Sequence, residues 1–215
     1  MPDPAILPAL RATIRENEIG AKSPYELEFA QKGQSGASFG FMQGDMHVQK
    51  DARDTMTAAL TAAGLAQAKI TQLMTALTPA LPKGNPLNSA DAKLVNDALN
   101  SATGRPLVDA MDQRIFQGIE KGVDDCVAAA QQGGVTMTPL ACLWIAPWIN
   151  MSGPPSLVLK WLKGAAINGV PAPGPPTVDD EEVRAYLQSL AYFQQNPKNF
   201  HHYEQCVAVG AALLP

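Results

Sequence analysis

Glu18 is the residue whose place in the sequence most directly suggests chemistry. The apolar residues Ile6, Leu10 and Ile14 recur every four positions, which predicts a helix over residues 5–18 with one buried face. Glu18 continues that series, so its carboxyl should point into the fold, where loss of hydration raises the pKa of a carboxylic acid. A carboxylic acid that keeps its proton near neutral pH can act as a general acid. The alternative is a carboxylate at a helix end that binds loop amides.

Residues 35–45 form a second stretch of unusual composition, with the sequence SGASFGFMQGD. Its first residues predict a turn, because glycine adopts backbone angles that other residues avoid, and Phe39–Met42 then predicts an extended segment. A segment that is both turn-rich and apolar typically borders a cleft. Asp45 ends the stretch, and its carboxylate could either serve chemistry or cap a helix that begins near His47.

The remaining candidates for chemistry are weaker. His201 and His202 are adjacent, so they point to different faces of a helix, and no further His or Cys spacing completes a metal site. Trp144 and Trp161 are expected in the core, whereas Trp148 could stack on a sugar ring. The sequence contains no GxSxG, phosphate-binding or HExxH motif.

The three cysteines, Cys126, Cys142 and Cys206, are sparse and lack CxxC spacing. This pattern argues against a metal site or a disulfide framework and favours buried free thiols, with a single disulfide as the alternative.

Composition limits the class of protein and its partners. The chain has 215 residues, of which 46% are hydrophobic and 17% charged, enough for a sizeable core. Its net charge of −4 argues against nucleic acid as a partner, since no basic stripe is present to meet phosphates. No run of about 18 apolar residues predicts a membrane span, and the N-terminus lacks the pattern of a signal peptide.

The elements that must position these residues are mainly helices. A small β-hairpin is expected from Tyr25–Phe29, a turn over residues 32–36, and the return segment Phe39–Met42. Apolar periodicity predicts further helices over residues 51–63, 66–77, 90–101, 106–132, 140–149, 156–163, 177–194 and 199–213. The longest of these begins at Pro106 and should be buried.

Several residues predict where the helices begin and end. Gly20 should end the first helix, Ser89 should cap the helix at 90–101, and Gly104 should break it. Thr138 should cap the apolar helix at 140–149, which Pro147 should kink or interrupt. The segment 153–155 should turn the chain, and the acidic residues 179–182 should form the solvated start of a helix, unless a partner binds them.

We expect one domain over residues 1–215. Residues 170–176 are rich in proline and are interpreted as a surface loop, because the residues that follow are few for an independent domain. The helices of 177–215 should pack onto the rest.

Three segments resemble the goose-type lysozymes and soluble lytic transglycosylases of the lysozyme-like superfamily. Ile14–Gly20 resembles their helix that ends in a catalytic Glu, and Phe39–Asp45 resembles their Gly-apolar-Met-Gln motif. Trp148–Pro155, followed by Lys160–Leu162, resembles their Ala-Tyr-Asn-Ala-Gly-Pro segment and the helix after it. The matches occur in the family's order and anchor roughly residues 5–165.

The resemblance implies a lysozyme-like fold and cleavage of the β-1,4 bond between N-acetylmuramic acid and N-acetylglucosamine, with no cofactor or metal. The catalytic acid carries over to Glu18, although an alignment with one gap would place it on Glu16, which lies off the buried stripe. Asp45, or failing it Glu28 or Glu26, would position or activate water. The implied substrate-binding residues are Tyr25, Ser38, Phe39, Met42, Gln43, Trp148 and Asn150. Glu18 and Asp45 would face each other across a groove.

Two departures from the family leave the mechanism open. The hairpin turn at residues 31–34 lacks the Asp of goose-type enzymes, and Ile149 replaces the transglycosylase Tyr, for which Tyr25 could substitute. An inverting hydrolase needs a base about 6.5–9.5 Å from the acid, whereas a lytic transglycosylase needs only the Glu. Asp45 favours hydrolysis. A chitinase- or chitosanase-like glycosidase and an inactive lysozyme-like binding module are the alternatives.

The expected partner is the glycan strand of peptidoglycan. Without a signal peptide, such an enzyme would be made in the cytoplasm and reach the bacterial cell wall or periplasm by phage-type lysis or by injection as a bacteriolytic effector. Injection would imply a cognate inhibitor, or immunity, protein.

Overall fold

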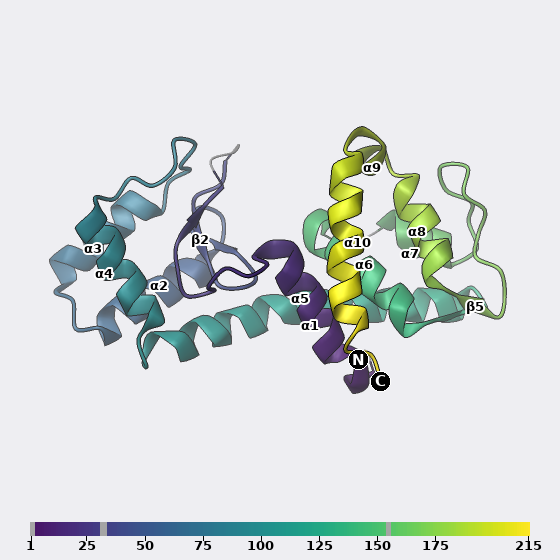
Figure 1. Cartoon of the computed structure of the whole chain (residues 1–215), viewed down its shortest axis with the longest axis horizontal. Coiled ribbons are helices and arrows are strands. Elements are labelled where there is room, and N and C mark those ends of the chain that lie inside the picture. Colours follow the sequence, from purple (N-terminus) through teal and green to yellow (C-terminus); the bar gives the residue numbers. More distant parts are fainter. Residues whose placement is uncertain (1–2, 31–33, 154–155) are drawn as a thin grey trace. The chain divides into compact units, whose positions relative to one another are not determined.

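The computed structural model describes residues 3–30, 34–153 and 156–215. The chain forms two compact units (Figure 1). The terminal unit comprises Met1–Gly20 and Phe116–Pro215, and the central unit, named for its place in the sequence, comprises Ala21–Ile115. The class is confirmed as mainly α, with 62% helix and a small antiparallel sheet. The single lysozyme-like domain stays a prediction.

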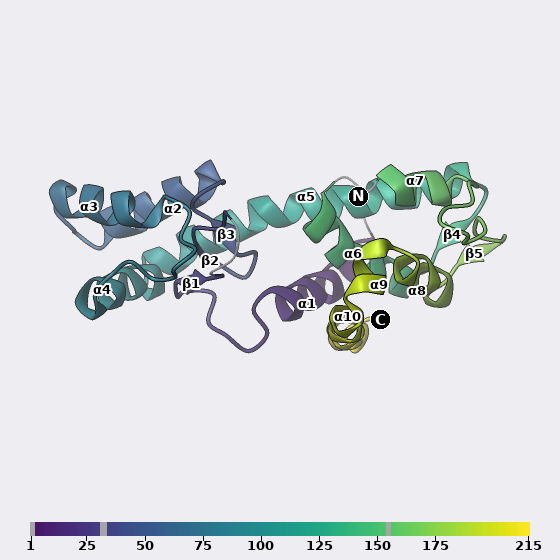
Figure 2. The same cartoon turned by 90° about the horizontal axis from the view of Figure 1, so that it is seen from above.

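Helices build the terminal unit. Its main packing joins α1 with α10 and α6, and α6 with α8 (Figure 1, Figure 2). The elements are η1 (Pro4–Ile6), α1 (Leu7–Glu18), the part of α5 (Gly104–Gln132) from Phe116 onward, β4 (Thr136–Met137), α6 (Pro139–Ser152), α7 (Ser156–Leu162), β5 (Thr177–Val178), α8 (Asp180–Gln188), α9 (Ala191–Gln195) and α10 (Pro197–Ala211).

The first helix is as predicted. Ile6, Leu10 and Ile14 are all buried, which confirms the apolar stripe that leads to Glu18. Gly20 has φ +54° and donates its N–H to the Arg15 carbonyl, so it ends α1 as expected of a glycine just beyond a helix.

Pro147 does not interrupt α6, so the interruption, one of the two predicted effects of this proline, is wrong. The Thr138 side chain accepts the Ala141 N–H and caps the helix as expected, and the helix then runs through Pro147 to Ser152. Residues 141–147 and 149 are all buried. We infer that burial on nearly every side offsets the backbone hydrogen bond that a proline inside a helix removes. The predicted turn at 153–155 falls in part on residues 154–155, outside the described residues.

The start of α8 also differs from the prediction. Thr177–Val178 is a strand that pairs in parallel with β4, not the first turn of a helix. Asp179 is the helix cap, because its side chain accepts the Glu182 N–H while the Glu182 carboxylate accepts the Asp179 N–H. The segment expected as one helix up to residue 194 is divided into α8 and α9.

The central unit combines a small sheet with helices. Its elements are β1 (Glu28–Phe29), β2 (Ala37–Phe39), β3 (Gly44–Asp45), α2 (Lys50–Ala62), α3 (Gln67–Leu77), α4 (Ser89–Asn100) and the part of α5 up to Ile115. The sheet is antiparallel, with Ser38 opposite both Glu28 and Asp45. Apolar side chains of the sheet and of all four helices share one core, which includes Phe39, Met56, Leu73, Leu99 and Met111.

The predicted hairpin is confirmed as the pair β1 and β2, but its return segment is shorter than expected. The chain reverses at Gly40–Gln43, where Gly40 and Gln43 have φ of +82° and +49°, and then forms the third strand β3. An extended Phe39–Met42 is therefore wrong, because positive φ angles belong to a tight turn. The hairpin turn itself includes residues 31–33, which are outside the described residues.

Gly104 begins α5 rather than breaking the preceding helix. The Ser101 hydroxyl accepts the Gly104 N–H, and a Cβ at Gly104 would lie 2.0 Å from the Ala98 carbonyl oxygen. Only glycine fits where the end of α4 meets the start of α5. The helix thus begins two residues before Pro106, the position predicted for its start.

Asn88, not Ser89, caps α4, because the Asn88 Oδ1 accepts the Asp91 N–H at 2.8 Å. Replacing Asn88 by alanine should therefore destabilise α4 by about 1 kcal/mol, the usual effect of losing a helix cap. Hydrogen exchange of the α4 amides measures this loss. Ser89→Ala is the matched control, and an equal loss in both variants would contradict the assignment.

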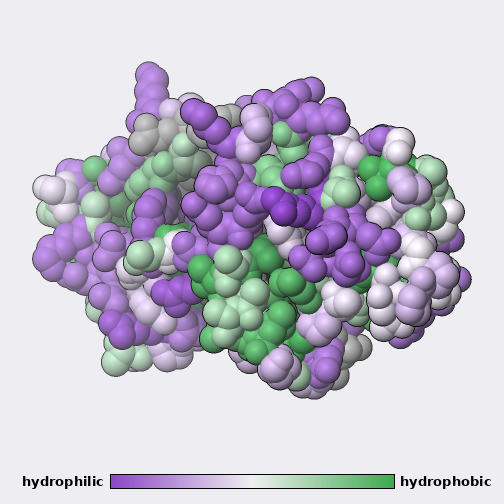
Figure 3. Space-filling model, turned by 45° about the vertical axis from the view of Figure 1, so that its right-hand side comes forward, coloured by the Kyte–Doolittle hydropathy of each residue, from purple (hydrophilic) through white to green (hydrophobic). Residues whose placement is uncertain are grey.

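No helix among the described residues is long and apolar enough to cross a membrane. The face drawn in Figure 3 is largely polar with one broader apolar area. Large hydrophobic side chains that are exposed include Val48, Met151, Leu157, Tyr192, Val209 and Leu213.

Candidate active site around Glu18

Glu18 and Asn150, predicted from separate motifs, are in contact within the terminal unit. Glu18 is the last residue of α1, and its Oε1 accepts a hydrogen bond from the Asn150 Nδ2 on α6 at 2.8 Å. The neighbouring Asn17 donates its Nδ2 to the same oxygen at 2.7 Å. The carboxyl is half-buried, and both donors are side-chain amides on helices, so the alternative of a helix-end carboxylate bound by loop amides does not describe these contacts.

Burial raises the pKa of Glu18 above 4.5, because the charged form loses hydration. The hydrogen bonds from Asn17 and Asn150 and the nearby charge of His202 act in the opposite direction with smaller effects. Glu18 therefore keeps its proton to a higher pH than an exposed glutamate. This is the property that the sequence pattern predicts for a general acid.

The hydrogen bonds also indicate which oxygen carries that proton. Oε1 accepts two N–H donors, which occupies both of its lone pairs. The proton of the neutral acid is therefore assigned to Oε2. The two amides fix the plane of the carboxyl and hold the acidic oxygen in a constant direction.

Helix α10 provides further neighbours of Glu18. Tyr203 is buried, its hydroxyl has no hydrogen-bond partner among the described residues, and its pKa is raised first by burial and in part by the charge of Glu18. Cys206 is buried as well, and the His202 ring lies 3.5 Å from its sulfur. The Glu18 carboxyl thus binds amides of α1 and α6 and lies near buried side chains of α10.

The raised pKa of Glu18 predicts how stability depends on pH. The folded state binds the Glu18 proton more tightly than the unfolded state, so Glu18 costs stability once the pH exceeds 4.5 and the unfolded chain loses its proton. The free energy of unfolding of the wild type should fall relative to Glu18→Gln as the pH rises from 4.5 through the folded pKa, and then stay constant. Urea unfolding at several pH values measures this difference. A difference that does not change with pH would contradict the raised pKa.

Trp148 belongs to an aromatic cluster. Its ring lies 6.1 Å from that of Tyr192 and 5.6 Å from that of Phe193, and it borders a surface hollow of about 190 Å³ together with Ser152 and Leu157. The predicted core positions of Trp144 and Trp161 are confirmed, since both are buried and stack on Phe200 and Tyr186 respectively.

The cysteines are free and buried, as predicted. His201 and His202 are exposed, and His201 contacts Glu204. In the described part of the chain, no three His, Cys, Asp or Glu side chains lie together in a way that could hold a metal ion.

In the central unit, Asp45 binds the backbone of its own loop. Its Oδ1 accepts the N–H groups of His47 at 2.7 Å and Gly36 at 3.1 Å, and its Oδ2 also accepts from Gly36 at 3.2 Å. No helix begins at His47, since the next helix starts at Lys50, so the expected helix cap is instead a cap of the turn that follows β3. These bonds give Asp45 a structural role, whether or not it has a catalytic one.

Among the predicted substrate-binding residues in the segment 38–43, two have buried side chains and two have side chains that form hydrogen bonds within the turn. Phe39 is fully buried in the core of the central unit, so its assignment to a cleft wall is corrected to core packing. Met42 is also almost fully buried. Ser38 donates its hydroxyl to the Gln43 Oε1 at 2.8 Å, and the Gln43 Nε2 donates to the Gly40 carbonyl at 3.0 Å, so these side chains stabilise the turn itself.

Tyr25 and Glu28 have partners within the central unit. The Tyr25 hydroxyl donates to Asp109 at 2.9 Å, and Arg105 lies over its ring. Glu28 forms an ion pair with Lys22 at 2.8 Å. Both residues thus belong to the central unit, whereas Glu18 belongs to the terminal unit.

Asp112 is one of two residues whose contacts were not predicted from the sequence. It lies on α5 at 1% exposure and accepts the N–H groups of Phe41 and Met42. A signal was present in the sequence, because Asp112 directly follows Met111 and lies four residues after Val108 on the apolar face of the longest predicted helix. Asn17 was missed as well, since an asparagine beside a glutamate has no distinctive pattern.

No protein-family profile, curated protein or solved structure matches this chain. The interpretation of its function therefore depends on the geometry around Glu18 and on the three sequence motifs.

Proposed function

We propose that the protein is a glycosidase of the muramidase type, which cleaves the β-1,4 bond between N-acetylmuramic acid and N-acetylglucosamine with Glu18 as the general acid. One observation carries the proposal: Glu18 and Asn150, which lie 132 positions apart and come from separate motifs of the resemblance, are joined by a hydrogen bond. That contact links the two motifs in space.

The chemistry follows from the state of the carboxyl. Glu18 in its neutral form would donate the proton on Oε2 to the glycosidic oxygen as the bond to the anomeric carbon breaks. Asn17 and Asn150 keep the carboxyl oriented, and because they bind the ionised form as well, they stabilise the carboxylate left after the proton transfer. The same carboxylate can then act as a base in the second half of the reaction.

A hydrolase and a lytic transglycosylase differ in what attacks the anomeric carbon. Hydrolysis by inversion needs a second carboxylate to activate water, and Asp45 is the first candidate from the sequence. The Asp45 carboxylate already accepts two backbone N–H groups, those of Gly36 and His47, which favours transglycosylation as a second candidate, since by the resemblance that reaction needs only Glu18 and the sugar's own hydroxyl.

Digestion of purified peptidoglycan and of chitosan with the full chain tests the proposal. Release of soluble fragments from peptidoglycan alone supports a muramidase, and release from chitosan alone supports the chitosanase-like alternative. If neither polymer is cut while a pull-down still retains the protein on peptidoglycan, the chain is an inactive binding module and the enzyme proposal is wrong.

A further inference from the structure

A buried carboxylate holds the turn of the Gly-apolar-Met-Gln motif. Asp112 reaches from α5 with its Oδ2 2.9 Å from the Phe41 nitrogen and its Oδ1 3.0 Å from the Met42 nitrogen. The side chain is almost completely shielded from water. Burying a carboxylate costs hydration free energy, and the hydrogen bonds from these two N–H groups offset part of that cost.

Gly40 is the residue that lets Asp112 approach. A Cβ at Gly40 would lie 2.3 Å from the Asp112 Oδ1 and 2.9 Å from the Met111 Cε, and Gly40 has φ +82°. Both the space and the backbone angle therefore require glycine. A Cβ at Gly44 would meet the Met111 side chain equally closely, at 2.8 Å, so both glycines of the motif let the loop lie directly against α5.

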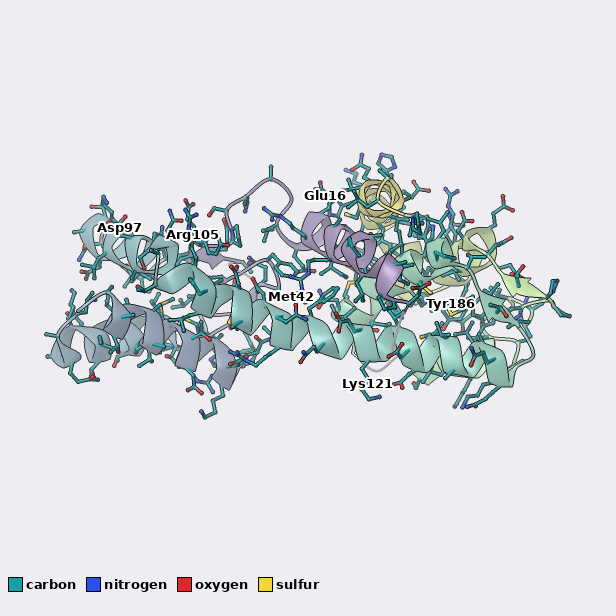
Figure 4. All side chains as sticks on the ribbon, turned by 90° about the horizontal axis from the view of Figure 1, so that it is seen from below. Glu16, Met42, Asp97, Arg105, Lys121 and Tyr186 are labelled. Atoms are coloured by element: carbon teal, nitrogen blue, oxygen red, sulfur yellow. The ribbon has the colours of Figure 1, made fainter. Side chains whose placement is uncertain are left out.

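The turn stores backbone strain that these contacts hold in place. Gln43 adopts φ +49°, a left-handed angle that is unfavourable for a residue with a side chain, and it donates its N–H to the Gly40 carbonyl at 3.2 Å. Ser38 and the Gly40 carbonyl fix both polar atoms of the Gln43 amide. Figure 4 shows Met42 beside α5.

We propose that Asp112 is a positioning residue of the glycan-binding turn Gly40–Gln43, an inference that rests on the proposed function. Asp112 touches no reacting atom. It acts through the backbone of Phe41 and Met42, and it sets the direction in which the turn presents the Gln43 amide and its own backbone to acetamido groups of the glycan. Loss of Asp112 should therefore weaken substrate binding more than it slows the chemical step.

Asp112→Asn tests the inference with little change in shape. The single oxygen of the new side chain can still accept one N–H, but its amide group turns a donor toward the other N–H. We expect hydrogen exchange of the Phe41 and Met42 amides to accelerate about tenfold or more, the effect of one unsatisfied buried donor. With soluble peptidoglycan strands as substrate, KM should rise by about tenfold while kcat stays within about threefold.

Gly40→Ala is a second variant that disturbs the contact of Asp112 with the turn, and Asp51→Asn is the control. In Gly40→Ala the new methyl group displaces the Asp112 carboxylate from the turn. This variant should therefore also raise KM more than it lowers kcat. Asp51→Asn removes another carboxylate that contacts α5, through the exposed ion pair with Arg114, and should change neither constant.

The outcomes separate this inference from the proposed function. Suppose that the wild type is active but the Asp112→Asn and Gly40→Ala variants keep the wild-type KM, or that kcat falls by the same factor as KM rises while amide exchange is unchanged. Either result would overturn the positioning role and leave the glycosidase proposal intact. A wild type that cuts no glycan would overturn the glycosidase proposal, and with it the role of Asp112 in catalysis.

Discussion

Replacing Glu18 by glutamine should lower kcat for glycan cleavage by about 10³-fold, within the range expected for loss of a general acid. The glutamine can still accept the two amide hydrogen bonds through its Oε1, so the site should keep its shape. It has no acidic proton to give. The fold should be as stable as the wild type or slightly more stable at neutral pH, because the half-buried charge is gone.

Glu16→Gln is the matched control for this prediction. Glu16 lies two residues earlier on α1, off the buried stripe, and is the acid in the alternative alignment. Initial rates of dye release from labelled peptidoglycan should remain at the wild-type level in this variant. If Glu16→Gln is inactive and Glu18→Gln active, the alignment with one gap is correct and the assignment of the acid to the inward face of α1 is wrong.

Replacing Gly210 by alanine should destabilise the terminal unit by about 3 kcal/mol, the upper part of the usual range for overpacking. A Cβ at Gly210 on α10 would lie 1.9 Å from the Thr13 Oγ1 and 2.6 Å from the Ala9 carbonyl oxygen on α1. Thr13 uses the same hydroxyl to donate to Ala9, so the added methyl breaks a buried hydrogen bond as well as a close helix contact. These two helices hold Glu18 and its neighbours from α10, so activity should fall with stability.

Gly118→Ala is the control for Gly210→Ala, because it adds the same methyl group where no side chain or neighbouring helix is close. Gly118 is inside α5, and a Cβ added there would have no heavy atom beyond its own helix backbone within 4 Å. Alanine there should stabilise the helix by about 0.5–1 kcal/mol. Urea unfolding followed by tryptophan fluorescence reports on this unit, because Trp144, Trp148 and Trp161 all lie in it. Equal effects of the two substitutions would contradict the close packing of α1 and α10.

Helices with strong apolar periodicity could be predicted from the sequence, because burial of one face determines both their formation and their length. The stripe Ile6, Leu10 and Ile14 is the clearest example, and it also predicted the inward direction of Glu18. Predictions failed where long-range packing overrides a local preference. Pro147 lies within an unbroken helix, and Gly104 begins a helix because the end of α4 leaves no room for a side chain.

The candidate site was predicted only in part, and the reason is physical. A motif indicates that Asn150 matters, but not that its amide reaches an oxygen 132 positions away in the sequence. Asp45 had the right residue type for a base, yet whether its oxygens accept backbone amides depends on the turn after β3. The contacts of Asp112 could not be predicted because they depend on which loop covers the apolar face of α5, and that is decided by the tertiary fold.

Mass spectrometry of the fragments released from purified peptidoglycan tests the central claim most directly. The wild type should produce new muramic acid ends, reducing after hydrolysis or 1,6-anhydro after transglycosylation, and Glu18→Gln should produce none above the level without enzyme. The claim that Glu18 is the acid of a glycan-cleaving site would be contradicted by new ends that appear equally with both proteins, or by intact strands after incubation with the wild type.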